Sequence, residues 1–290
     1  LITALICSLV APFPHEFLLL QFMAGVVFII SLKELSQRSQ LLRCAFLISL
    51  AYMLGYIGLS LYQDGDFNKI DWRMGIYFGI NFVLLMFSYV LIYMMEKAFG
   101  YVSPITLVEL SNINTPLLKK LSETCAGTFQ HSLQVSILAS AASAKIGADT
   151  QLVRTGALYH DIGKMKNPPF FTENHMKGIN PHRDLPFEQS AQIIISHVTE
   201  GIKMAEKAGL PEAIIDFIRT HHGAGKAKYF YNSYCNAHPG EPVDESLFTY
   251  PGPNPFTRET AILMMADSVE AASRSLNEYT DETIGALVNK

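Results

Sequence analysis

The sequence predicts an all-α protein in which transmembrane helices are followed by a soluble bundle of helices. Residues 44–62 and 74–95 contain no charged side chain, and each run exceeds the roughly 18 apolar residues that mark a bilayer-spanning helix. After residue 100, apolar residues recur at helical spacing between residues that typically cap helices. Because no segment there alternates apolar and polar residues as a half-buried strand does, we expect no β-sheet.

Residues 1–100 are predicted to form the membrane region, with about four spans. Residues 17–32 form a shorter apolar run after Glu16, which is either a span with snorkelling flanks or a buried hairpin; we expect a span. Residues 1–10 are apolar but have no initiator Met, basic n-region or cleavage site. We therefore expect the tail of a truncated span there rather than a signal peptide.

The segments between the spans predict their orientation, since Lys and Arg are retained on the cytoplasmic side. Lys33, Arg38 and Arg43 mark the loop after the second apolar stretch as cytoplasmic. Residues 62–73 carry more acidic than basic side chains and are expected to face outward. The last span then returns the chain to the cytoplasm near Lys97, where the soluble domain is expected.

The composition of the chain excludes several classes of soluble domain. The four cysteines lie without CxxC spacing, so neither a disulfide framework nor a zinc ribbon is expected. A net charge of −4 without a basic stripe argues against a long nucleic acid as partner. The chain also lacks the GxSxG elbow of serine hydrolases and the Gly-rich loops that cradle nucleotides.

The soluble domain, residues 119–290, is expected to follow a linker at residues 101–118. Thr115 and Pro116 suit the N-cap and the first position of its first helix. A loop rich in glycine and aromatic residues is expected before the last helix of the set. Five helices are predicted, over residues 128–146, 150–162, 187–208, 211–222 and 257–276.

These helices carry a set of histidines and aspartates among their apolar residues. An unpaired polar group buried in a core costs roughly 2–7 kcal/mol, and metal coordination satisfies several such groups at once. Nitrogen and carboxylate donors without thiolate suit Fe, Mn, Co or Zn. The candidate ligands are His131, His160, Asp161, His197, His221, His222 and Asp267.

The set is too large for one tetrahedral ion. Two ions about 3.5–4 Å apart, bridged by a carboxylate and a hydroxide, use all seven residues and form a clamp for displacement at phosphorus. Asp161 is the expected bridge, because it follows another ligand directly in the sequence. A single ion and purely structural polar packing are the alternatives.

Further residues are candidates for contact with a phosphorylated substrate. Lys164 shares a helix side with Asp161 and is either a phosphate ligand or a solvated lysine. Arg274 is expected to neutralise developing charge with Lys164, or else to orient Asp267 or pair with Glu270. The remaining candidates, for substrate contact or base stacking, are Asn180, His182, Lys226, Tyr229, Phe230 and Tyr250.

The pair His160-Asp161, with the other candidate ligands, resembles the motif of the HD-domain metal-dependent phosphohydrolases. His197 and the pair His221-His222 correspond to the extra ligands of the binuclear branch. The HD-GYP enzymes of that branch, which hydrolyse cyclic di-GMP, carry a GYP triplet soon after the paired histidines. The chain instead continues with Gly-Ala-Gly-Lys at residues 223–226, which argues against cyclic di-GMP.

The fuller resemblance is to the seven-transmembrane HD phosphodiesterases of the PgpH type. Their HDIGK, NPH and THHG motifs have counterparts at residues 160–164, 180–182 and 220–223. The resemblance implies a multi-pass protein of the bacterial cell membrane that hydrolyses cyclic di-AMP to linear pApA with two divalent ions, iron or manganese. It assigns the metals to the seven candidate ligands and allows a homodimer.

Other readings stay open beside this resemblance. The substrate is alternatively another nucleotide, such as cyclic di-GMP or a guanosine polyphosphate. The domain is alternatively a membrane receptor that binds a nucleotide without cleaving it. The family's large extracellular region and remaining spans have no counterpart in these 290 residues, as expected for a chain that starts within a longer protein.

Overall fold

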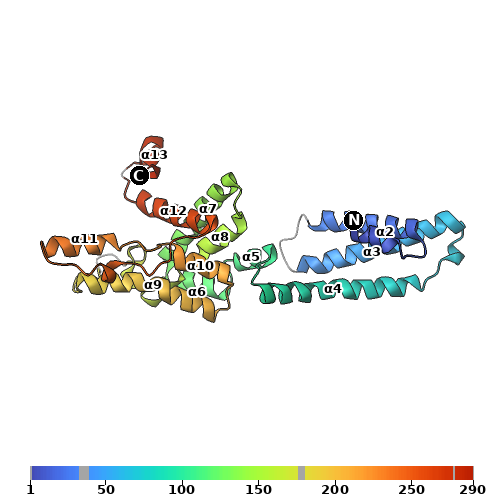
Figure 1. Cartoon of the computed structure of the whole chain (residues 1–290), viewed down its shortest axis with the longest axis horizontal. Helices are drawn as coiled ribbons and strands as arrows, with labels where there is room; N and C mark the ends of the chain where they lie inside the picture. The colour runs from blue at the N-terminus through green and yellow to red at the C-terminus, as the bar shows by residue number, and fades with distance from the viewer. Residues whose placement is uncertain (1, 33–38, 176–179, 277, 290) are drawn as a thin grey trace. The chain divides into compact units, whose positions relative to one another are not determined.

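A computed structural model describes residues 2–32, 39–175, 180–276 and 278–289 (Figure 1). Within these ranges the chain is helical, and the one pairing between extended segments is an isolated bridge between Lys226 and Thr249. The predicted all-α class, with apolar helices that precede a helical domain, is confirmed. The chain divides into two compact units, Leu1–Ile105 and Thr106–Lys290.

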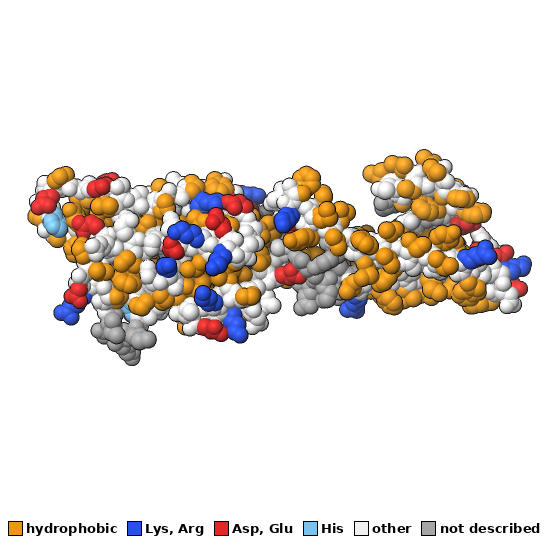
Figure 2. Space-filling model, turned by 90° about the horizontal axis from the view of Figure 1, so that it is seen from below, with side chains coloured by type: hydrophobic (Ala, Val, Ile, Leu, Met, Phe, Trp, Pro, Cys, Tyr) orange, Lys and Arg blue, Asp and Glu red, His pale blue; other side chains and the backbone are white. Residues whose placement is uncertain are grey.

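Among its described residues, the first unit contains three helices that are long and apolar enough to cross a membrane: α2 (Pro14–Leu32), α3 (Ser39–Asp64) and α4 (Met74–Phe99). They coincide with the three predicted runs. Figure 2 shows hydrophobic side chains spread over the outside of this unit, as a lipid-facing surface requires. Helix α2 packs on α3 and α3 on α4, so these helices form one antiparallel group of neighbours.

Two expectations about the first unit stay predictions. Helix α1 (Ile2–Ser8) is far shorter than a span, so the truncated fourth span is not tested by it. Lys33 and Arg38, on which the cytoplasmic orientation rests, lie outside the described residues. A short turn, η1 (Phe67–Lys69), occupies the loop expected to face outward.

From residue 104 onward the described residues form nine helices and four short 3₁₀ turns, the first helix beginning just before the start of the second unit. The helices are α5 (Pro104–Leu110), α6 (Pro116–Thr124), α7 (Ala126–Ile146), α8 (Thr150–Tyr159), α9 (Phe187–Lys207), α10 (Glu212–Thr220), α11 (Lys228–Ala237), α12 (Arg258–Ser273) and α13 (Asp281–Val288). The turns are η2 (Ile162–Lys166), η3 (Pro168–Phe170), η4 (Thr172–Asn174) and η5 (Glu245–Phe248).

Three local expectations differ from the structure. The segment 101–118 contains α5, whose carbonyl at Leu110 accepts a hydrogen bond from the Tyr159 hydroxyl at 2.8 Å. The loop expected before the last ligand helix contains α11, because Phe230, Tyr231 and neighbouring aromatic side chains pack on α9. The helix expected to reach residue 162 ends at Tyr159 and continues as a tighter turn.

The core of this unit joins α7, α8, α10 and α12. Its buried side chains include Val135, Val153, Phe217 and Leu263, one from each helix. Gly156 permits the close approach of α8 to α10, since a Cβ there would lie 2.3 Å from the Phe217 ring. This packing places the carboxyl ends of α8 and α10, and the histidines that follow them, next to each other.

Gly163 brings the turn after α8 against α9 in the same way. A Cβ at Gly163 would lie 1.8 Å from the backbone carbonyl oxygen of His197 and 2.5 Å from the backbone nitrogen of Gly201. Only glycine therefore allows η2 to pack directly on the α9 backbone. As a result, the carboxylate of Asp161 lies beside the ring of His197.

Candidate metal centre

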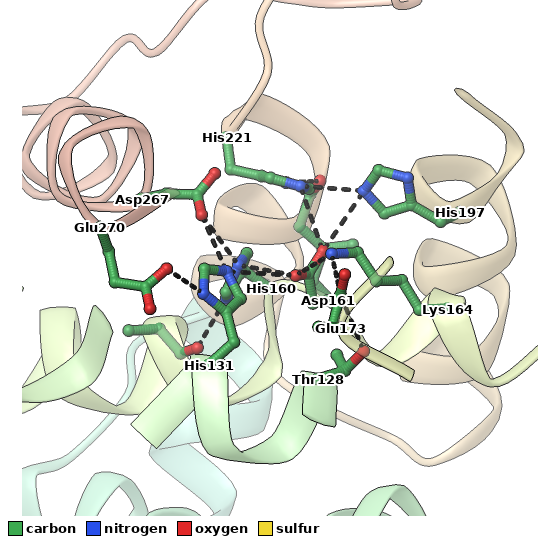
Figure 3. A network of polar contacts seen from close by, with 12 residues as sticks. Thr128, His131, His160, Asp161, Lys164, Glu173, His197, His221, Asp267 and Glu270 are labelled. Carbon is green, nitrogen blue, oxygen red and sulfur yellow. Dashed lines mark hydrogen bonds and ion pairs between the residues drawn. The ribbon is translucent and has the colours of Figure 1, made fainter. Parts of the chain in front are cut away.

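The structure brings the seven predicted ligands together from α7, α9 and α12 and from the residues that directly follow α8 and α10. Figure 3 labels six of them, all but His222. Six of the seven form two groups, in each of which the ligand atoms lie within 4.8 Å of one another. We call these the aspartate group, His131, His160 and Asp267, and the three-histidine group, His197, His221 and His222. All but His222 are buried.

Asp161 lies between the two groups. Its Oδ2 atom is 3.2 Å from Nε2 of His160 and 3.5 Å from Nε2 of His131. Its Oδ1 atom is 3.4 Å from Nε2 of His197 and 3.7 Å from Nε2 of His221. One carboxylate oxygen thus faces each group, which is the arrangement that a bridging ligand requires.

Hydrogen bonds at Nδ1 orient three of the histidine rings. A carbonyl oxygen can only accept, so each Nδ1 carries a proton, and in the neutral ring the lone pair lies on Nε2. This tautomer is the one that presents Nε2 to a metal. The hydrogen bond at Nδ1 also fixes the orientation of the ring. The bonds run to the carbonyl three residues earlier, from His160 to Ala157 (2.7 Å), His197 to Ile194 (2.6 Å) and His221 to Ile218 (2.8 Å).

The residues present fit a divalent cation at each group. The Nε2 atoms of His197 and His221 lie 3.1 Å apart although both rings carry their proton on Nδ1, so two lone pairs face each other. Nε2 of His160 and Oδ1 of Asp161 are buried and have no hydrogen-bond partner among the described residues. A cation satisfies these orphaned donor atoms, and their nitrogen and oxygen chemistry suits a transition metal.

The charges of the site differ between the two groups. Burial alone would lower the pKa of His160, but the Asp161 and Asp267 carboxylates outweigh it and raise that pKa to about 10. Burial lowers the pKa of His222 to about 3 and holds that of His221 well below its usual range. A proton on His160 therefore offsets the carboxylates when no cation does so.

Two acidic residues that the sequence analysis did not assign to the site contact its side chains. Glu270 contacts His131, and Glu173 contacts Lys164. The first, Glu270, places a carboxylate oxygen 2.6 Å from Nδ1 of His131. Its other oxygen accepts hydrogen bonds from the Arg274 guanidinium at 2.7 and 3.0 Å. The predicted role of Arg274 in neutralising charge at the substrate is not favoured, since Arg274 lies on the Nδ1 side of His131, away from the ligand atoms.

The second acidic residue is Glu173, which shares Lys164 with Asp161. The Lys164 ammonium lies 2.8 Å from Oδ2 of Asp161 and 2.7 Å from Oε1 of Glu173. The Thr128 hydroxyl donates to Glu173 at 3.1 Å, and Lys164 holds the pKa of Glu173 below its usual value although burial opposes this. Gly127 allows the turn η4, which contains Glu173, to lie against α7, because a Cβ at Gly127 would lie 1.9 Å from the Glu173 carbonyl oxygen.

The sequence contained a signal for Glu270 but not for Glu173. Glu270 is three residues after Asp267 and four before Arg274, so all three share a face of α12. Glu173 is separated from the helices by turns without periodicity, and its position depends on the fit of that loop against α7.

Of the predicted substrate contacts, Tyr250 is brought to the centre. It is buried, and its ring centroid lies 4.3 Å from that of His222. Lys226 instead pairs with Glu245 at 2.7 Å, and Tyr229 is 74% exposed on α11. Substrate contact by Lys226 and Tyr229 stays a prediction.

Asn180 and His182 lie in the loop that precedes α9. His182 donates from Nε2 to the Phe170 carbonyl at 2.9 Å, and its ring lies 4.9 Å from that of Phe230. Asn180 is exposed and accepts a hydrogen bond from the His182 backbone at 3.0 Å. These contacts tie the loop to α11 and do not bring either residue to the two groups.

Comparison with known proteins agrees with an apolar helical region followed by an HD domain. Residues 1–103 match the family described as 7TM receptor with intracellular HD hydrolase, and residues 128–272 match the HD domain. The cyclic-di-AMP phosphodiesterase PgpH of Listeria monocytogenes is 38% identical over 269 residues, which cover 92% of this chain and 37% of that protein. PgpH of Bacillus subtilis is 37% identical over 269 residues, with coverage of 91% and 37%.

A solved structure is similar to the soluble unit. The crystal structure of the L. monocytogenes PgpH HD domain in complex with cyclic-di-AMP is 46% identical, with a TM-score of 0.58. The match covers 61% of this chain and 82% of that domain. The chain thus spans most of the solved domain but only 37% of the full-length PgpH proteins.

Proposed function

The chain belongs to the family of seven-transmembrane proteins with an intracellular HD hydrolase, and from this premise we propose that it is a membrane-anchored phosphodiesterase that hydrolyses cyclic di-AMP to linear pApA. The main structural support for this chemistry is the position of the Asp161 carboxylate, which directs one oxygen toward each group of ligands. The choice of substrate is supported by the similarity to an HD domain solved with cyclic-di-AMP.

In this proposal the seven ligands hold two divalent cations, iron or manganese. Such cations acidify water and polarise phosphoryl oxygens. Asp161 would contribute one carboxylate oxygen toward each group, and the Nδ1 hydrogen bonds of His160, His197 and His221 keep their Nε2 atoms oriented. Because the ligands are already oriented, little reorganisation is needed when the phosphodiester binds.

Lys164 is the cation of the chain that we assign to the substrate phosphate. Its ammonium lies beside Asp161, and Glu173 keeps it there when Asp161 serves as a ligand. The side chains of Lys164 and Glu173 are only 13% and 11% exposed, which strengthens the electrostatic effect of Lys164 on a negatively charged group nearby. We assign Arg274 a positioning role through Glu270 and His131 instead.

We also propose that the HD domain, residues 119–290, faces the cytoplasm, and that residues 1–100 anchor it in the bacterial cell membrane. The basic residues Lys33, Arg38 and Arg43 support this orientation by their place in the sequence. Accessibility of the domain to protease in inverted and right-side-out vesicles tests it. Cleavage in right-side-out vesicles alone would contradict the cytoplasmic placement.

The substrate is tested with the whole chain in lipid nanodiscs. Metal content is measured, and the protein is incubated with cyclic di-AMP, cyclic di-GMP and a guanosine polyphosphate in parallel. We expect about two ions per chain and release of pApA from cyclic di-AMP. Intact cyclic di-AMP in the presence of two bound ions overturns the substrate, and tight binding without product makes the protein a receptor.

A further inference from the structure

His222 differs from the other histidines of the centre in how its ring is held. The rings of His131, His160, His197 and His221 each have a hydrogen-bond partner at Nδ1, whereas no described residue makes a hydrogen bond to the His222 ring. Rings surround it instead. Its centroid lies 4.3 Å from that of Tyr250 and 4.1 Å from that of His221.

The backbone determines where the Tyr250 ring lies. Its N–H donates to the Gly225 carbonyl at 2.8 Å, and the Ala227 N–H donates to the Phe248 carbonyl at 2.8 Å. The Asn254 side chain accepts a hydrogen bond from the Ala224 N–H at 3.0 Å. The segment around Tyr250 is therefore attached at three points to the segment that directly follows His222.

The Tyr250 side chain is also packed on its other sides. It is 9% exposed and belongs to a buried cluster with Phe248 and with Ile195 and Val198 of α9. The planes of the Tyr250 and His222 rings are inclined by 33°, a tilted face contact. This contact occupies one face of a ring that the sequence analysis names as a candidate for base stacking.

The two groups depend on this contact to different degrees. The aspartate group contains Asp267 and has Glu270 behind His131, so charge and hydrogen bonds hold its ligands. The three-histidine group contains no carboxylate of its own beyond the shared Asp161, and one of its three rings lacks a hydrogen-bond anchor. Loss of orientation at His222 therefore affects this group alone.

We propose that Tyr250 is a positioning residue that holds the His222 ring in place for the second metal ion of the centre. This inference rests on the proposed function, in that both groups bind metal. Contacts behind a ligand typically change metal affinity by about 10–100-fold. The same range is expected here for the three-histidine group, with the affinity of the aspartate group unchanged.

The test is a Mn²⁺ titration of the whole chain in nanodiscs, followed by metal analysis after dialysis. Tyr250→Phe keeps the ring and is expected to retain about two ions, because no described residue makes a hydrogen bond to the Tyr250 hydroxyl. Tyr250→Leu removes the ring and is expected to retain about one ion at Mn²⁺ concentrations that saturate the unaltered chain. Tyr279→Leu, at a tyrosine 68% exposed, is the matched control and should bind as the unaltered chain does.

A double variant shows whether Tyr250 acts through His222. Tyr250→Leu combined with His222→Ala should lose no more metal affinity than His222→Ala alone, because both remove the same interaction. Additive losses overturn the proposal, and so does a Tyr250→Leu protein that keeps both ions at unaltered affinity. Equal loss in Tyr250→Phe also overturns it, since the hydroxyl would then be the active group.

The outcomes separate this inference from the proposed function. If the unaltered chain binds no metal, the proposed function fails and the inference fails with it. If the unaltered chain binds two ions and cleaves cyclic di-AMP while Tyr250→Leu still holds both, only the inference is wrong. If Tyr250→Leu does not fold, Tyr250→Met, which also removes the ring, replaces it in the same titration; about one retained ion is expected, and two ions at unaltered affinity overturn the proposal.

Discussion

Nδ1 of His131 lies 2.6 Å from the carboxylate of Glu270, whereas the rings of His160, His197 and His221 are oriented by main-chain carbonyls. A carboxylate behind a ligating histidine fixes the ring and raises its basicity. Arg274 holds Glu270 in place, so a chain of three side chains leads from the surface to the aspartate group.

Glu270→Gln should weaken metal binding at the aspartate group by about 10–100-fold, because it removes the charge behind His131. Metal content after dialysis against graded chelator measures the loss. The matched control is Glu282→Gln, at an exposed acid in the first turn of α13. Unchanged retention of both ions in Glu270→Gln would show that the carboxylate does not support the ligand.

Asp161→Ala should abolish turnover and lower the occupancy of both groups, since each of its oxygens faces one of them. The loss of both ions distinguishes a bridging ligand from a ligand of one group. Asp184→Ala, at an exposed loop residue, is the control. Near-normal activity of Asp161→Ala would refute the bridging role.

Glu173→Gln should destabilise the protein by up to about 1.5–3 kcal/mol, the usual value of a hydrogen bond to a charged group, because the amide oxygen still accepts from Lys164 but no longer carries a negative charge. Urea unfolding of the protein in detergent, with and without Mn²⁺, measures the change. The control is Glu123→Gln, whose contact with Lys119 is exposed and should be worth less than about 1 kcal/mol. Equal effects of the two substitutions would contradict a supporting role for Glu173.

Gly163→Ala should disrupt the centre although it changes no ligand. Its methyl group meets the His197 carbonyl oxygen, so η2 must move away from α9 and carry Asp161 with it. We expect loss of turnover and of metal at the three-histidine group. Gly285→Ala, in open space on α13, is the control and should be neutral or stabilise by up to about 1 kcal/mol. Full activity of Gly163→Ala would show that the close approach is dispensable.

Metal affinity should rise with pH, because the carboxylates raise the pKa of His160 to about 10 and the ring must lose its proton before Nε2 can bind a cation. Between about pH 6 and 9 the apparent affinity of the aspartate group is expected to rise about tenfold per pH unit, one proton being released. Calorimetry in two buffers of different ionisation enthalpy counts that proton. An affinity independent of pH in this range would contradict the prediction.

The spans, the all-α class and the family resemblance were accessible from the sequence, because each depends on local pattern. The uncharged run that became α4 and the periodic residues of α7 and α12 are visible without knowledge of their neighbours. The seven residues singled out as ligands share a chemical reason, the cost of burying unpaired histidines and aspartates in core helices. The structure brings these seven together.

Only the tertiary structure decided which side chains stand behind those ligands. Glu173, Glu270 and Tyr250 reach the centre through contacts between segments far apart in the chain, and no spacing rule connects them to His131 or His222. Arg274 shares a helix face with Asp267, yet its guanidinium bonds Glu270 because that carboxylate is closer along the helix. Periodicity shows which face of a helix is buried, whereas the packing of helices and glycines determines what that face meets.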